Sequence, residues 1–319
     1  MRRINRIEPW DRMIAEGSPY NLEVASLGYE SRARFIASEL RATGKKRMAI
    51  GFGTQQTCAY EDNRNWFQRQ GFGVNDVADQ SFFAFCAETI RTLTFDEKET
   101  IRVRIDISSM SRYRIAALLA AFIESEAPQE FVLDFVYAPA EFIEPPHEMS
   151  QIESAGPVLP QFAGWSEEPD RPVATVFGVG FEYDRAIGVV EYLEPSEIWS
   201  FRPENRDTRF HEEVFRANSF FWRLVPASHQ FTYRIDFPID CLIDLESLTF
   251  GLLSHARPIL IPFGPKLFAL CCLLVAHLHF PRVGVWRVSS GTNEGPVDRK
   301  ADGRIVGMCV QLTRNDIFP

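Results

Sequence analysis

Two segments of the chain, residues 102–122 and 258–278, have the same order of residue types. Each starts with a short apolar run containing β-branched residues, passes through a short loop, and ends in an apolar pattern of helical period. A cation closes the loop in both cases, Arg112 in the first segment and Lys266 in the second. A buried strand that leads into a buried helix is typical of parallel sheets covered by helices on both faces. We therefore expect an α/β chain in which one structural unit occurs twice.

Strands and helices alternate in the same order in both halves of the chain. The first half predicts strands at residues 22–27, 47–52, 101–107 and 131–137, and helices at residues 31–42, 62–70, 82–93 and 112–124. The second half predicts strands at residues 173–177, 197–201, 231–235, 259–261 and 283–288, and helices at residues 185–193, 208–218, 239–253 and 267–278. This order predicts two tandem Rossmann-like lobes of three layers, related by internal duplication. Residues 1–138 form the first expected lobe and residues 173–319 the second, joined by a proline-rich acidic linker at residues 139–172.

A short motif follows the first strand of each half. Residues 28–30 read Gly-Tyr-Glu and are followed closely by Arg32, whereas residues 180–182 read Gly-Phe-Glu and are followed closely by Arg185. The glycine precedes the later cation by 84 positions in the first half and by 86 positions in the second. Two such similar offsets support the predicted duplication.

The repeated loops predict a ligand site. In open parallel sheets, ligands bind outside the carboxyl ends of the strands, where the strand order reverses. Glycine permits close backbone approach there, and a helix N-terminus, hydroxyls and cations can together hold an anion. The candidate ligand-binding residues are Ser26, Gly28, Tyr29, Glu30, Arg32, Asp106, Ser108, Ser109 and Arg112 in the first half, and Gly178, Gly180, Glu182, Arg185, Gly264 and Lys266 in the second.

Other roles for these residues remain open at this point. Ser109 or Ser111 is also a suitable helix cap. Glu30 could form a purely structural ion pair with Arg112. Alternatively, Glu30 and Glu182 could each hydrogen-bond a ribose hydroxyl or a base edge. The sequence does not decide among these roles, and it identifies no catalytic residue.

The loops resemble those of a known family. Residues 26–40, SLGYESRARFIASEL, and residues 106–120, DISSMSRYRIAALLA, are similar to CRISPR-associated Rossmann fold (CARF) domains. These domains carry a Gly/Ser-containing loop after the first strand and a Thr-Gly-Gly-Thr-Lys-like loop before a later helix. The resemblance places on ligand-binding loops the residues Ser26, Gly28, Ser108, Ser109, Arg112, Gly178, Gly180, Gly264 and Lys266. The chain departs from the pattern because Ser-Ser-Met at residues 108–110 replaces the paired glycines, and because prolines stiffen residues 262–266.

The resemblance implies a sensor. A chain with two CARF-like lobes would bind a nucleotide-type or other phosphate-bearing small molecule in the crevice between them. It would then pass the signal to a separate effector protein, in a bacterial antiviral defence system. The unlike loops, with arginine in one half and lysine in the other, suit an asymmetric ligand.

Two other classes of function remain. One is an enzyme that hydrolyses or transfers a nucleotide or a phosphorylated metabolite without a metal. The other is a protein-binding scaffold with a vestigial site. The chain contains no Walker P-loop, and Tyr183 occupies the position of the third glycine of a dinucleotide fingerprint.

Net charge, cysteine spacing and the length of apolar runs limit the kinds of partner and cofactor that we expect for this chain. A net charge of −9 argues against an extended nucleic-acid surface. The six cysteines lack metal-ligand spacing, so we expect neither a metal nor another cofactor. No run reaches the roughly 18 apolar residues of a membrane span, and we expect a cytoplasmic protein.

Overall fold

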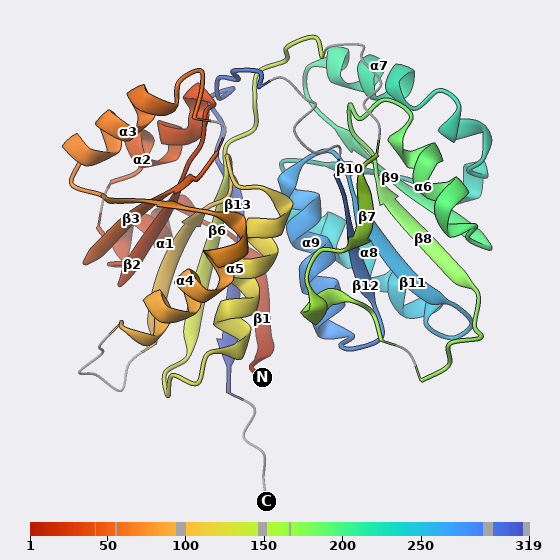
Figure 1. The fold of residues 1–319 in the computed structure, drawn as a ribbon, viewed down its shortest axis with the longest axis horizontal. Coiled ribbons are helices and arrows are strands. Elements are labelled where there is room, and N and C mark those ends of the chain that lie inside the picture. Colours follow the sequence, from red (N-terminus) through yellow and green to blue (C-terminus); the bar gives the residue numbers. More distant parts are fainter. Residues whose placement is uncertain are drawn as a thin grey trace, which may run out of the picture. The chain divides into compact units, whose positions relative to one another are not determined.

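The computed structural model describes residues 1–41, 43–54, 56–93, 100–145, 152–165, 167–289 and 296–314. The chain forms two compact units, each built on its own sheet (Figure 1). The first unit consists of residues 1–141 together with the chain from residue 296 onward, and the second consists of residues 142–295. The predicted α/β class is confirmed, because helices accompany a seven-stranded sheet in the first unit and a six-stranded sheet in the second.

Five parallel strands form most of the first sheet. They are β2 (Leu22–Leu27), β3 (Lys46–Phe52), β4 (Gly73–Val77), β5 (Ile101–Asp106) and β6 (Phe131–Tyr137), in the spatial order β4-β3-β2-β5-β6. β13 (Val306–Thr313) pairs antiparallel with β6, and β1 (Arg3–Pro9) pairs antiparallel with β13. Strands from both ends of the chain therefore complete one edge of this sheet.

Helices flank the first sheet (Figure 1). They are α1 (Arg12–Gly17), α2 (Phe35–Glu39), α3 (Tyr60–Arg69), α4 (Asp79–Arg91) and α5 (Arg112–Glu124). Tyr60 and Phe67 of α3 pack on the face of the sheet that carries Ala25, Leu27 and Ala49, and α4 packs against α5. The helix predicted at residues 31–42 is a 3-10 turn, Ser31–Arg34, followed by the short α2.

The second sheet repeats the parallel arrangement. β8 (Val173–Gly178), β9 (Glu197–Glu204), β10 (Gln230–Arg234), β11 (Arg257–Pro262) and β12 (Gly284–Ser289) lie in the order β10-β9-β8-β11-β12, and β7 (Ser154–Pro157) pairs antiparallel with β12. The accompanying helices are α6 (Arg185–Leu193), α7 (Thr208–Ala217), α8 (Pro238–Leu252) and α9 (Lys266–Leu278). In both units the first parallel strand is central, the second and third lie to one side, and the fourth and fifth lie to the other. An antiparallel strand then follows the fifth.

Burial explains the apolar central segments. All six residues of β2 are buried, as expected for a strand covered on both faces. In α9, buried residues run continuously from Leu267 to Ala276, so this helix is covered all round. Its 13 residues are too few for a bilayer, and no helix in the described part of the chain is both long and apolar enough to cross one.

The expected lobe boundaries need two corrections. Residues 296–314 do not belong to the second lobe, because β13 pairs with β6 and β1 of the first unit. The segment from residue 142 to residue 172 is not simply a linker, because it belongs to the second unit and contains β7. Both errors arise from antiparallel strands whose partners are distant in the sequence, so that local pattern does not indicate which sheet they join. The shared strand order agrees with internal duplication, which stays a prediction.

Candidate functional site

Each unit has one position where the strand connections change direction. It lies between β2 and β5 in the first unit and between β8 and β11 in the second. Loops at the carboxyl ends of such strand pairs form the usual ligand site of open parallel sheets. We call residues 26–32 with 106–112 the first switch point, and residues 178–185 with 262–266 the second switch point.

The two loops of the first switch point touch closely. A Cβ on Gly28 would lie 2.7 Å from the Cβ of Ser109, so the approach requires glycine. The backbone N–H of Ser108 donates to the Asp106 carboxylate at 2.8 Å, and the Ser108 hydroxyl accepts the N–H of Ala138 at 2.9 Å. The structure thus brings the predicted glycine and serines together, and their hydrogen bonds join the two loops to the end of β6.

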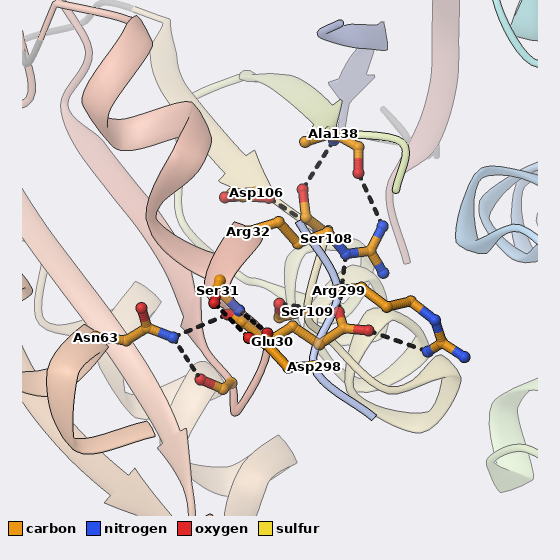
Figure 2. Close-up of polar contacts among 11 residues, drawn as sticks. Glu30, Ser31, Arg32, Asn63, Asp106, Ser108, Ser109, Ala138, Asp298 and Arg299 are labelled. Atoms are coloured by element: carbon orange, nitrogen blue, oxygen red, sulfur yellow. Dashed lines mark hydrogen bonds and ion pairs between the residues drawn. The ribbon is translucent and has the colours of Figure 1, made fainter. Parts of the chain in front are cut away.

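Glu30 lies at the centre of a buried polar cluster at the first switch point (Figure 2). Its carboxylate accepts Arg32 Nε at 2.8 Å, Arg299 Nη1 at 3.2 Å and the Ser109 hydroxyl at 3.5 Å. Glu30 and Arg32 are each only 5% exposed. The structure gives Glu30 ion pairs with Arg32 and Arg299, and the pair with Arg112 considered from the sequence stays untested.

Arg32 points into the first unit. Its Nη1 donates to the carbonyl of Ala138 at 2.9 Å, and its guanidinium carbon lies 5.7 Å from the ring centroid of Tyr137. Burial alone would lower the pKa of Arg32, but Tyr137 and Glu30 outweigh this effect, so the pKa is raised and the guanidinium stays charged. Arg32 therefore has partners within the first unit, and the ligand contact expected from the sequence stays a prediction.

The C-terminal part of the chain covers the first switch point. The Asp298 carboxylate accepts both the backbone N–H and the hydroxyl of Ser31, each at 2.6 Å (Figure 2). The carbonyl of Arg299 accepts the N–H of Arg32 at 3.1 Å. Sequence reasoning missed Asp298 and Arg299, because 267 positions separate Ser31 from Asp298 and no local pattern connects them.

Two buried asparagines hold corresponding glycine loops. Asn63 of α3 is fully buried, and its amide donates to the carbonyl of Gly28 at 3.0 Å. Asn218 directly follows α7, is 2% exposed, and donates to the carbonyl of Gly180 at 2.9 Å. The sequence analysis did not find this pair, although glycine and asparagine are 35 positions apart in the first unit and 38 in the second. That recurring offset was the signal that could have identified them.

The loops of the second switch point meet through their backbones. Gly264 has a φ of +66°, and a Cβ there would collide with the carbonyl oxygen of Val179. A Cβ on Gly180 would collide with the backbone of Gly264, and one on Gly178 would collide with the ring of Phe268. The predicted glycines are thus required sterically. Backbone contact, rather than a serine, joins the two loops.

The carboxylate of Glu182 bridges the two loops of the second switch point. It accepts the N–H of Gly264 at 3.1 and 3.2 Å, one distance for each oxygen. Glu182 therefore holds the β11 loop, and Glu30 occupies the corresponding position in the first unit. The two glutamates have different partners, one mainly cations and the other a backbone amide.

The repeated cations lie at matching positions. Arg112 is the first residue of α5 and Lys266 is the first residue of α9, each following the fourth parallel strand of its unit, and both are half-buried. Arg185 is the first residue of α6. Ser111 caps α5, because its hydroxyl accepts the N–H of Arg114 at 3.2 Å. The matching placement predicted from the sequence is therefore present, while a ligand contact by either cation stays a prediction.

Aromatic side chains pack around the second switch point. The ring of Phe181, between Gly180 and Glu182, stacks on Phe210 of α7 at 5.6 Å between centroids. Phe142 meets both rings edge-on, at 6.2 and 5.2 Å. The hydroxyl of Tyr183 donates a hydrogen bond to Glu213. Burial, the larger cause, and this hydrogen bond, the second cause, raise the pKa of Tyr183 to about 12. At neutral pH Tyr183 is therefore a neutral donor.

Metal ligands do not gather in the described ranges. No group of three or more histidine, cysteine, aspartate or glutamate residues there is placed to hold a metal ion. Cys86, Cys241, Cys271 and Cys272 are buried free thiols. Burial raises the pKa of Cys86 to about 12, so this thiol is protonated at neutral pH.

Comparisons with known proteins give no family for the chain. No protein-family model matches it, and no curated protein matches its sequence. The chemistry of the two switch points is therefore the basis for any functional assignment.

Proposed function

We propose that this protein binds a nucleotide-type or other phosphate-bearing small molecule at the second switch point and passes the signal to a separate effector protein. The observation that carries the proposal is the second switch point itself. Two glycine loops, each too close to the other for a side chain, meet at the carboxyl ends of β8 and β11. Lys266 begins the 13-residue α9 on one of these loops, so its charge and the positive end of the helix lie together.

The ligand class follows from this arrangement. A half-buried lysine at a helix N-terminus favours an anion with several acceptor oxygens, and phosphate fits that description. The resemblance to CARF domains supports a nucleotide as the molecule that carries the phosphate. The proposed site lies within the second unit alone, which is a narrower proposal than a single site shared by two lobes.

The first switch point favours a different role for the first unit. Asp298 already accepts the N–H and hydroxyl of Ser31, and Arg32 is buried against Glu30. Asp298, from a distant part of the chain, thus occupies donors of the first loop, whereas at the second switch point the N–H of Gly264 is held by Glu182 of the adjoining loop. The distant segment that covers the first loop favours the scaffold alternative for the first unit, with the second unit carrying the ligand.

Calorimetry on the full chain tests the proposal. Mononucleotides, linear and cyclic oligonucleotides, sugar phosphates and inorganic phosphate form the panel. Lys266→Ala should weaken binding of whichever compound binds by about tenfold or more, because a charge-assisted hydrogen bond is worth roughly 1.5–3 kcal/mol. Lys266→Arg should retain most of the affinity.

A matched control separates a local contact from the loss of one positive charge. Arg282 is exposed and directly precedes β12. It therefore lies at the amino ends of the parallel strands, whereas the second switch point lies at their carboxyl ends. Arg282→Ala should bind the panel compound as tightly as the parent. If no phosphorylated compound binds, or if Arg282→Ala and Lys266→Ala weaken binding equally, the second switch point is not the site.

A further inference from the structure

β10 forms one edge of the second sheet. In the described part of the chain it pairs with β9 alone, and this parallel pairing runs from Gln230 to Arg234 without a shift of register. The backbone groups on the outer side of an edge strand can pair with a strand of another chain. Many proteins prevent this by a bulge, a proline, charged side chains or a very short edge strand. An edge strand without these features is a candidate interaction surface.

The other three edge strands of the described sheets have features that oppose pairing. The register of β1 shifts between Ile4 and Arg6, as at a bulge. β7 has only four residues and ends with Pro157. β4 contains Asn75 and Asp76, which are residue types depleted in strands. β10 differs from all three in its regular register and in its composition.

The residues of β10 favour an extended strand that is held in place. Phe231, Thr232 and Tyr233 are residue types enriched in strands. The rings of Phe231 and Tyr233 stack on other rings of the second unit, at 4.9 and 5.4 Å between centroids. Gln230, Thr232 and Arg234 alternate with them and are exposed. One face of the strand is therefore packed, and its backbone is positioned before any partner binds.

The sequence of β10 is complementary to itself. When two copies pair antiparallel about a two-fold axis at Thr232, the two threonines lie opposite each other, which is a favourable cross-strand pair. Gln230, whose amide donates to a backbone carbonyl, then lies opposite Arg234 of the second copy, and its side-chain oxygen can accept the guanidinium N–H. Phe231 lies opposite Tyr233 of the second copy, as an aromatic pair. No like charges meet in this register.

From these features we propose that β10 pairs with β10 of a second copy of this chain, so that two six-stranded sheets join edge to edge. Phe237 extends the surface, because it is 45% exposed and its ring centroid lies 4.3 Å from the guanidinium carbon of Arg234. Two five-residue strands with this ring form a smaller interface than those of permanent dimers. The dimer should therefore form reversibly as the concentration rises. The inference does not rest on the proposed ligand.

Sedimentation velocity of the full chain over a range of concentrations tests the dimer. The fraction of dimer should rise with concentration in the parent. Thr232→Lys should weaken association by roughly fivefold or more, because two lysines then lie opposite each other at the axis. Thr232→Val keeps a β-branched side chain and should retain association. Circular dichroism checks that each variant keeps its fold, as expected for an exposed position.

The effect of Thr232→Lys must be local to support the proposal. The chain has a net charge of −9, so an added lysine lowers the overall repulsion between copies and cannot weaken association through net charge. Ala84→Lys is the control, because Ala84 is an exposed position of α4 in the first unit. It adds the same charge and should leave the dimer intact.

Complementary charges test the two-fold axis directly. Thr232→Glu should weaken association as Thr232→Lys does, because two carboxylates then lie opposite each other. An equimolar mixture of the two variants should restore association, since a lysine then lies opposite a glutamate. Only a register that brings residue 232 of both copies together predicts this rescue.

Hydrogen exchange locates the interface. The amides of residues 230–234 should exchange more slowly at high concentration than at low concentration. The amides of β4, the corresponding edge strand of the first sheet, should not change. Concentration-dependent protection at β4 or elsewhere, without protection at β10, would place the interface outside β10 and overturn the proposal.

Two further outcomes would also overturn it. A parent that stays monomeric at all concentrations would leave the β10 edge for a strand of another protein. A dimer that Thr232→Lys and Ala84→Lys weaken equally, or that the mixture of charged variants does not restore, would not be paired at Thr232. Calorimetry with Lys266→Ala tests the ligand site separately, so failure of one proposal leaves the other standing.

Discussion

Glu30 and Glu182 occupy corresponding positions in two sheets of the same strand order, yet their surroundings differ. Glu30 is 5% exposed and pairs with Arg32 and Arg299. Glu182 accepts the backbone N–H of Gly264. At the first switch point charged side chains from distant segments join the loops, whereas at the second the loop backbones touch at the glycines and Glu182 adds a hydrogen bond between them.

This difference shows how one sheet edge can serve two purposes. A buried ion pair with further hydrogen bonds fixes its loops, because removing either partner leaves an uncompensated charge. Loops that meet through glycine bring their backbones together with no side chain between them, beside the half-buried Lys266 at the start of α9. We therefore expect the first switch point to contribute mainly stability, and binding stays proposed for the second. The following experiments test that division from the largest expected effect to the smallest.

The largest effect should come from Arg32→Ala. It leaves Glu30 buried without its main partner, so the free energy of unfolding of the first unit should fall by about 3–5 kcal/mol. Hydrogen exchange of the β2 amides measures this, with the β8 amides as the reference for the second unit. Glu30→Leu together with Arg32→Met should recover much of the loss, because both buried charges are then gone and Arg299, the other partner of Glu30, is about one-third exposed. A loss below about 1 kcal/mol in Arg32→Ala would contradict the assignment of stability to this pair.

Glycine substitutions should separate the two kinds of loop contact. Gly264→Ala should cost the second unit at least about 2 kcal/mol, since its φ of +66° and the nearby carbonyl of Val179 both oppose a side chain. Gly28→Ala should cost about 1–3 kcal/mol in the first unit. Exchange of the core amides of each unit measures both costs.

A second substitution distinguishes the two glycines further. The obstacle at Gly28 is the Cβ of Ser109, so Ser109→Gly should relieve Gly28→Ala. The obstacle at Gly180 is the backbone of Gly264, which no substitution removes. If Ser109→Gly does not restore the stability of the Gly28→Ala variant, the obstacle at Gly28 is the backbone, as it is at Gly180.

The two asparagines should have similar effects, despite the difference between the sites. Asn63→Ala and Asn218→Ala each leave a buried glycine carbonyl without its amide partner, at a cost of about 1–3 kcal/mol. Amide exchange in the corresponding unit is the measurement. Similar costs would support the predicted duplication, whereas a cost in one unit alone would weaken it.

The smallest effect concerns pH. The pKa of Tyr183 is raised to about 12 in the folded state, from about 10 in an unfolded chain. The neutral form therefore stabilises the second unit below pH 10, and this stability is lost as the pH rises from about 10 to about 12. Tyr183→Phe should flatten the fall over this window in a denaturation series. An unchanged slope would show that Glu213 does not hold the phenol.

Local pattern was sufficient for the parallel core of both units. The strands around Leu27 and Ile107, and the helices that begin at Arg112 and Lys266, follow from apolar periods and loop residues. β1 and β7 lie at sheet edges, and β13 lies between β1 and β6. All three were missed because they pair antiparallel with segments that are distant in the sequence. The parallel strand β4 was missed as well, and it is recognised as a strand from its pairing with β3.

The candidate site divides in the same way. The sequence identified the glycines, serines and cations, because their types and spacing recur at the ends of matching strands. It did not identify Asn63, Asp298 or Arg299 as parts of the first switch point.

The amino-acid sequence by itself determined most of the alternating strands and helices of the parallel core, the glycine loops and the matching positions of Arg112 and Lys266. Only the tertiary structure decided that the C-terminal strand returns to the first sheet and that Asp298 covers Ser31. The physical reason is range. Periodicity reports which side of a segment is buried, whereas an ion pair or an edge strand depends on which distant segment supplies the partner.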